Sequence, residues 1–109
     1  MRVFLATLAS FALAFVAWDA QARPLNQNDR SVCGWGAQIA AEAQQSKLSG
    51  ATLYAARKKL QVRRFAKPWM RMTAMGITEQ TYNSRSRLPP KAIKQTYYEQ
   101  CVQHAVARR

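Results

Sequence analysis

Two cysteines, Cys33 and Cys101, constrain what this chain can fold into more than any other feature of the sequence. They lie near the two ends of the stretch that carries helical patterns, and no third cysteine competes for pairing. In an oxidising compartment such a pair usually forms a disulfide and not a thiol site. We therefore expect one disulfide, Cys33–Cys101, that joins the first helix to the last. Two free buried thiols, or a bridge between two chains, are the alternatives.

The beginning of the chain has the pattern of a cleavable signal peptide. Arg2 precedes an uncharged apolar run over residues 3–17, and an Ala-Gln-Ala site ends at Ala22. A signal peptidase accepts small side chains at the first and last places of that site, so we expect cleavage after Ala22 and a periplasmic or secreted protein. The alternative is a membrane anchor, which needs about 20 apolar residues. The apolar run stops at Asp19, before that length is reached.

The remaining sequence predicts one small all-α domain. Residues 23–30 are polar and are expected to form a flexible lead, followed by a single helical domain over residues 31–109. Apolar residues recur there at steps of three and four, the spacing of one helical face, and no useful stretch alternates as a strand does. The prediction is a bundle of three or four helices. The expected helices are Val32 to Leu48, Thr52 to Ala66, Pro68 to Tyr82 and Pro90 to Val106.

Local signals set the boundaries of these helices. Asp29 or Ser31 is expected to cap the first helix, and Gly50 to end it in a left-handed conformation. Pro68 separates the second helix from the third, because proline disfavours helix at the residue before it and suits a first turn. Gly34 and Gly36 weaken the start of the first helix and would let another segment approach near the first cysteine.

Helical spacing also favours the predicted disulfide. Ile93, Tyr97 and Cys101 follow one another at intervals of four residues, so the second cysteine lies on a single apolar stripe of the last helix. On the first helix, Cys33 lies beside the face that contains Ile39 and several alanines. Two helices packed through these faces would bring the two sulfurs together.

The charge of the chain points to anionic partners. It has 17 lysines and arginines against 5 aspartates and glutamates, a formal net charge of +12. Such a surface attracts polyanions through long-range fields and counterion release. For an exported bacterial protein the available partners are lipopolysaccharide, anionic lipid, acidic wall polymers, extracellular DNA or an acidic protein. The alternative is that the charge serves solubility alone.

The charge is concentrated in residues 57–71, which contain seven basic residues and no acidic one. We expect these residues to form an anion-binding surface: Arg57, Lys58, Lys59, Arg63, Arg64, Lys67 and Arg71. On a continuous helix, one apolar arc would lie opposite most of the cations: Val62, Phe65, Trp69 and Met72. That arc either packs into the core with the charges solvated, or presents a polyanion-binding face, or lies in a membrane interface. Pro68 argues against the membrane interpretation, because a kink disrupts a flat apolar face.

Nothing in the sequence spacing predicts catalysis, a metal site or a cofactor. General acid–base chemistry needs two groups positioned together, and the four acids after residue 22 are spread over four segments. The single histidine, His104, and two distant cysteines do not make a metal set. No glycine-rich phosphate loop is present. We expect a protein that is not an enzyme; the opposite would require Glu42, Glu99 and His104 to converge in one cleft.

Taken together, a signal peptide, an early cysteine, a glycine cap and a proline-led last helix with a late cysteine resemble small exported proteobacterial helical proteins that are uncharacterised. The residues that carry the resemblance are Cys33, Gly50, Tyr82, Pro89 and Cys101. The resemblance implies a helical fold with one disulfide, located in the periplasm or outside the cell, and it implies no activity.

Two functions of different kinds remain open at this point. The first is a non-enzymatic exported protein that binds an anionic envelope component or acidic partner through the basic residues 57–71. The second is a structural, protein-interaction or chaperone-like envelope module in which the charge is incidental. In that case the contacts would come from exposed aromatic residues, namely Trp35, Trp69 or Tyr97.

Overall fold

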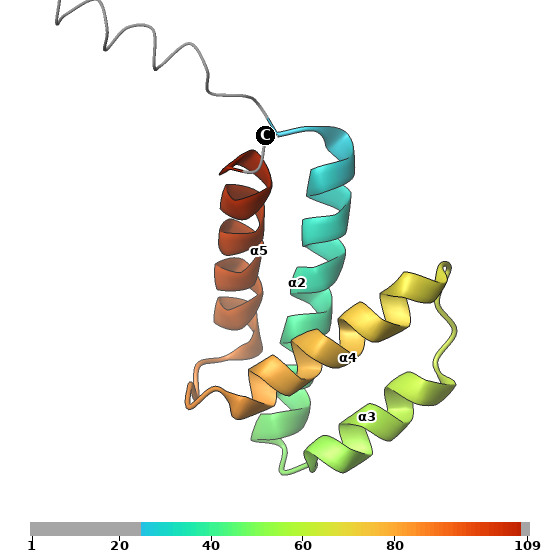
Figure 1. Cartoon of the computed structure of the whole chain (residues 1–109). Helices are drawn as coiled ribbons and strands as arrows, with labels where there is room; N and C mark the ends of the chain where they lie inside the picture. The colour runs from blue at the N-terminus through green and yellow to red at the C-terminus, as the bar shows by residue number, and fades with distance from the viewer. Residues whose placement is uncertain (1–24, 108–109) are drawn as a thin grey trace, which may run out of the picture.

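The computed structural model describes residues 25–107, which form four α-helices and no strand, and so confirms the predicted all-α fold. The predicted signal peptide and its cleavage site lie outside the described residues. The helices are α2 (Gln27–Leu48), α3 (Leu53–Val62), α4 (Pro68–Asn83) and α5 (Pro90–Ala107). In Figure 1, α2 and α5 run side by side in opposite directions, and α3 and α4 form a helical hairpin across the C-terminal half of α2.

Helix α2 begins earlier than the sequence predicted. Asn26 is its N-cap, and the Asn26 Oδ1 atom accepts a hydrogen bond from the Asp29 backbone N–H at 2.7 Å. The expected start at Val32, with Asp29 or Ser31 as the cap, is therefore wrong. Residues 27–30 form the first turn although they are polar and mostly exposed. All four side chains are polar, so this turn carries no apolar periodicity that the sequence could show.

The end of α2 agrees with the prediction. Gly50 has a φ of +92°, the left-handed conformation that glycine adopts without steric cost. The Gly50 N–H donates to the Lys47 carbonyl at 3.1 Å, and the Ala51 N–H donates to the Ser46 carbonyl at 3.0 Å. These two bonds form a Schellman motif, which satisfies carbonyls that the last turn would otherwise leave unpaired. The chain then turns directly into α3, for which the Thr52 hydroxyl is the N-cap.

The first and last helices pack closely along small side chains. The side chains of Ala37 and Ala40 are buried on α2, and Gly36 faces Tyr97 of α5. A Cβ atom at Gly36 would lie 2.7 Å from Tyr97 Cε1, so a glycine is required for this approach. Burial against α2 raises the pKa of the Tyr97 hydroxyl above its ordinary value. The expectation of a close approach is confirmed at Gly36, whereas Gly34 has open space around its Cα.

The predicted disulfide is present. Cys33 and Cys101 are bonded to each other, with their Cα atoms 5.6 Å apart, and they are 68 positions apart in the sequence. Cys33 is only 2% exposed. The bond therefore lies inside the α2–α5 contact and closes a loop that contains α3, α4 and the three connections between the four helices.

The core lies where α2, α3 and α4 meet. Its fully buried residues come from all three helices: Ile39, Ala40, Leu60, Ala74 and Ile77. Half-buried side chains pack around them, among them Trp35, Phe65, Met75, Ile93 and Tyr97. Ile39, on the apolar face predicted for the first helix, is part of this core. Val32, at the start of the same predicted helix, is 37% exposed and is not part of it.

Helix α3 ends at Val62, four residues before the predicted end at Ala66. Residues 63–67, which we call the hook, are not helical, and Arg63 has extended backbone angles. Pro68 is the first residue of α4, as predicted, and Lys67 before it is extended. The other two predicted helices match α4 and α5 to within one residue at their C-terminal ends.

Two side chains of α2 hold the connection between α4 and α5. Gln44 is completely buried, and its Nε2 atom donates to the carbonyls of Ser86 and Leu88 at 3.1 and 2.8 Å. The ammonium group of Lys47 donates to three carbonyls, those of Thr81, Ser84 and Ser86, at 3.1, 2.9 and 3.0 Å. Lys47 therefore caps the end of α4, and its charge is directed into the fold.

Candidate anion-binding surface

The seven basic residues of the candidate surface belong to three structural elements and not to one continuous helix. Arg57, Lys58 and Lys59 lie on α3, and Arg71 lies on α4. The remaining three, Arg63, Arg64 and Lys67, lie on the hook. Because the hook interrupts the helical phase, the predicted apolar arc does not exist. Its members have different environments: Val62 is 83% and Met72 is 76% exposed, whereas Phe65 packs against the core.

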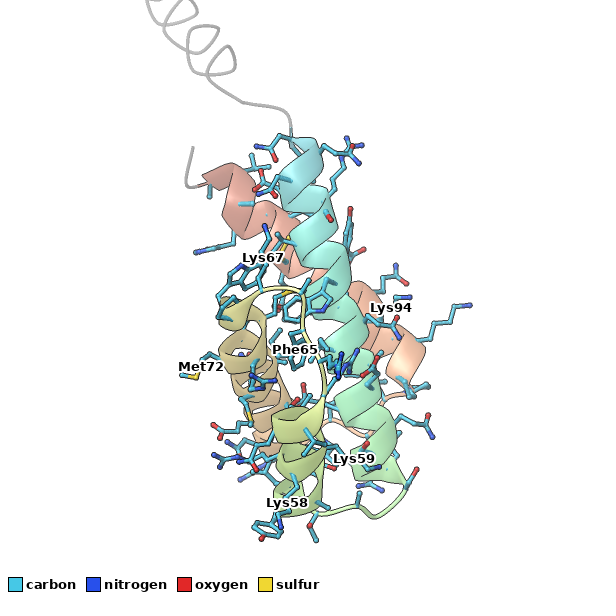
Figure 2. The ribbon with its side chains drawn as sticks, turned by 90° about the vertical axis from the view of Figure 1, so that its right-hand side faces the viewer. Lys58, Lys59, Phe65, Lys67, Met72 and Lys94 are labelled. Atoms are coloured by element: carbon cyan, nitrogen blue, oxygen red, sulfur yellow. A yellow bond between two sulfur atoms is a disulfide. The ribbon has the colours of Figure 1, made fainter. Side chains whose placement is uncertain are left out.

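An aromatic cluster fixes the hook onto α2. The ring of Trp35 lies edge-to-face with the rings of Phe65 and Trp69, at centroid distances of 6.3 and 5.7 Å. Such arrangements are favoured because the edge of one ring is positive and the face of the next is negative. Figure 2 shows Phe65 between the hook and α2. Trp35, one of the aromatic residues expected at an exposed interface, is instead half-buried here, as is Tyr97.

Two of the arginines hold the hook in place. The Arg63 guanidinium pairs with the Glu42 carboxylate at 2.7 Å and lies 5.4 Å from the centroid of the Phe65 ring. The Arg71 guanidinium covers the same ring at 5.5 Å. It also donates to the carbonyls of Arg63 and Leu60, at 2.8 and 3.4 Å. These contacts satisfy carbonyls at the end of α3 and stack two cations against one aromatic side chain.

Two other cations of the set have partners on the hairpin. Arg57 pairs with the Glu79 carboxylate at 3.0 Å and so joins α3 to α4. The Lys58 ammonium lies 5.3 Å from the centroid of the Tyr54 ring, one turn earlier on α3. Both pairs are on the surface, where ion pairs and cation–π contacts each contribute roughly 1 kcal/mol or less. These residues therefore remain available to a stronger partner.

Three cations of the set have no such role: Lys59, Arg64 and Lys67. All three are exposed, and among residues 25–107 the ion pairs are Arg57–Glu79 and Arg63–Glu42. Figure 2 shows Lys67 on the hook and Lys58 and Lys59 farther along α3. The structure thus divides the predicted set into arginines that build the hairpin and cations that project from it.

A second group of cations was not singled out from the sequence. It lies at the connection between α4 and α5 and in the first turns of α5: Arg85, Arg87, Lys91 and Lys94. All four are exposed. Figure 2 shows Lys94 on the side of the molecule opposite Met72 of the hairpin. The signal in the sequence is the alternation of serine and arginine over residues 84–87, shortly before the two prolines.

A groove of about 710 Å³ is bounded by α2, α4 and α5. Its ionisable side chains are Asp29, Tyr97 and His104, and no lysine or arginine lines it. Glu42 lines a separate, smaller cavity, and Glu99 lines neither. The three residues that an enzyme would need to bring together therefore do not share one cavity. The groove is also distinct from the basic hairpin.

Metal binding and membrane spanning are two further properties considered for residues 25–107. No group of three histidine, cysteine, aspartate or glutamate side chains in this range is arranged to hold a metal ion. No helix in the same range is long and apolar enough to cross a membrane. Comparison of the chain with protein-family models, curated proteins and solved structures finds no match. The resemblance to small exported proteobacterial proteins therefore stays a prediction.

Proposed function

We propose that this chain is a non-enzymatic, exported helical protein that binds an anionic component of the bacterial envelope through its α3–α4 hairpin. The observation that carries the proposal is the division of the cations on the hairpin. Lys59, Arg64 and Lys67 are exposed and lack a carboxylate partner, while neighbouring arginines are used to hold the hook that presents two of them.

The electrostatics support binding at this place. Residues 57–71 contain seven cations, and two of them pair with carboxylates, those of Glu42 on α2 and Glu79 on α4. The hairpin therefore keeps a strong local excess of positive charge. Contact with phosphate or carboxylate groups releases the counterions condensed on a polyanion, which makes binding favourable and dependent on salt. A hook held by Arg71 and Phe65 presents its cations on an ordered backbone, so binding does not require the hook backbone to become ordered.

A short duplex DNA is a suitable probe for this proposal because its phosphate spacing is known. We expect the purified protein to bind it at low ionic strength, with an affinity that falls linearly on a logarithmic plot against salt concentration. Replacement of the three projecting cations (K59Q, R64Q and K67Q together) should weaken binding and reduce the slope of that plot by roughly 2 to 3. Fluorescence anisotropy at several salt concentrations measures both quantities.

The matched control removes the same number of charges from the other basic group. The variant R85Q, R87Q and K91Q has the same net charge as the first triple variant, so long-range attraction is lowered equally in both. We expect the control to retain most of the affinity and of the slope. Equal losses in the two variants would show that net charge alone drives binding. Wild-type protein that binds neither this DNA nor vesicles of anionic lipid at low salt would end the proposal.

A further inference from the structure

Large apolar side chains are exposed on the same hairpin that carries the projecting cations. Six large apolar residues within residues 25–107 are more than about a third exposed, and four belong to the hairpin: Tyr54, Val62, Trp69 and Met72. The other two, Val32 and Leu88, are 37% and 52% exposed and lie elsewhere. A Val62 that is 83% exposed and a Met72 that is 76% exposed make almost no contribution to the core.

Three of these apolar residues, Val62, Trp69 and Met72, lie close to the hook in the sequence. Val62 is the last residue of α3, and Trp69 is the second residue of α4. Met72 follows Trp69 by three positions, so the two lie on the same side of α4. Arg64 and Lys67 lie between Val62 and Trp69 in the sequence, and both are exposed. We call these five residues, Val62, Arg64, Lys67, Trp69 and Met72, the hairpin tip.

The hairpin tip projects from the fold and is accessible to a binding partner. Figure 1 shows the closed end of the hairpin projecting away from α5, beyond the side of α2. Figure 2 shows Met72 pointing outward from α4, whereas Phe65 of the hook points inward toward α2. The aromatic contacts of Trp35 and the hydrogen bonds of Arg71 hold this arrangement, so the apolar groups are presented without rearrangement of the fold.

The hairpin tip combines cations with exposed aliphatic and indole side chains. This combination favours one class of anionic partner over the others. A soluble polyanion such as DNA or an acidic polysaccharide pairs with the cations but offers no apolar phase to valine or methionine. An anionic lipid layer offers both, because headgroups attract lysine and arginine while the boundary with the acyl chains takes up apolar side chains. Tryptophan is favoured at that boundary, where its ring is apolar and its N–H remains near water.

We propose that the hairpin tip is a lipid-binding device that docks the protein onto the surface of an anionic lipid layer, with Val62, Trp69 and Met72 inserted at the level of the headgroups. The inference rests on the proposed function, since Arg64 and Lys67 serve in both. A second copy of the chain is a less suitable occupant, because two tips that each carry an excess of positive charge repel one another.

Vesicle binding tests the inference. The protein is sedimented with vesicles of phosphatidylcholine alone and of phosphatidylcholine mixed with phosphatidylglycerol. We expect binding to the mixed vesicles only, accompanied by a blue shift of tryptophan fluorescence that a W69F variant loses. The variant V62S and M72S should fold normally, because both side chains are exposed. It should bind mixed vesicles about tenfold more weakly or worse, while its affinity for duplex DNA stays unchanged.

The control variant is L88S, which removes an exposed apolar side chain away from the hairpin. It should bind both probes as the wild type does. Unchanged vesicle binding by V62S and M72S, or an equal loss on vesicles and on DNA, would overturn the inference. So would a change in self-association of the free protein without a change in vesicle binding. DNA binding without vesicle binding would remove the inference alone, whereas salt-dependent binding to neither probe would remove the proposed function as well.

Discussion

Arg63 and Arg64 are adjacent in the sequence and have different surroundings. The Arg63 guanidinium pairs with Glu42 and lies over Phe65, whereas Arg64 is exposed and has no carboxylate partner among the described residues. The partner of Arg63 comes from α2, 21 positions away. The sequence pattern grouped both residues in one anion-binding set because it contains composition and spacing but no tertiary contacts. Only the fold separates the arginine that stabilises the hairpin from the one that projects from it.

Gly36 and Gly34 offer a matched test of the α2–α5 contact. Replacing a helical glycine by alanine normally stabilises the helix by about 1 kcal/mol. G34A should show that gain, because no atom lies within 4 Å of its new Cβ. G36A should be less stable than G34A by roughly 1 to 3 kcal/mol, since its Cβ would lie 2.7 Å from Tyr97 Cε1. Urea unfolding of the two variants measures this difference. Equal stability would mean that Tyr97 moves aside without cost.

At the scale of the helices, the sequence predicted the boundaries that local chemistry determines. Pro68 and Pro90 begin α4 and α5, and Gly50 ends α2 with two Schellman hydrogen bonds. The boundaries it missed depend on contacts between elements. Phe65 continues the apolar spacing of α3, so the pattern extended the helix, but the ring is held by Trp35. The first turn of α2 consists of polar residues and therefore carries no apolar pattern.

The disulfide joins two helices that are distant in the sequence, and its removal should affect the whole domain. Closing a loop of 68 positions restricts the unfolded chain and stabilises the folded state by about 4 kcal/mol on the chain-entropy model. Replacing both cysteines with serine should therefore lower the melting temperature by more than about 10 °C. Thermal unfolding followed by circular dichroism measures this, with reduced wild-type protein as the control. Equal melting of the variant and the oxidised protein would contradict the account.

At the scale of the whole molecule, the positive charge has more than one role. Lys47 caps the end of α4, Arg63 and Arg71 hold the hook, and Lys59, Arg64 and Lys67 face solvent. The groove between α2, α4 and α5 has no lysine or arginine at all among its lining residues. The net charge of +12 predicted an anionic partner in general. Its distribution over the fold leads us to propose one face, the α3–α4 hairpin, as the place where such a partner binds.

The most direct test compares two double variants that lose the same charge from the same hook region. R64Q and K67Q together should change the free energy of unfolding by less than about 0.5 kcal/mol, because both side chains are exposed. R63Q and R71Q together should lower it by roughly 1 to 3 kcal/mol, because a surface ion pair and hydrogen bonds to two carbonyls are lost.

The deciding measurement is the affinity of each double variant for duplex DNA, at one salt concentration and at a temperature where both are folded. We expect R64Q with K67Q to bind more weakly than R63Q with R71Q, although the second double variant is the less stable protein. Equal affinities, or weaker binding by R63Q with R71Q, would contradict the division of the hairpin cations into those that build the fold and those that bind.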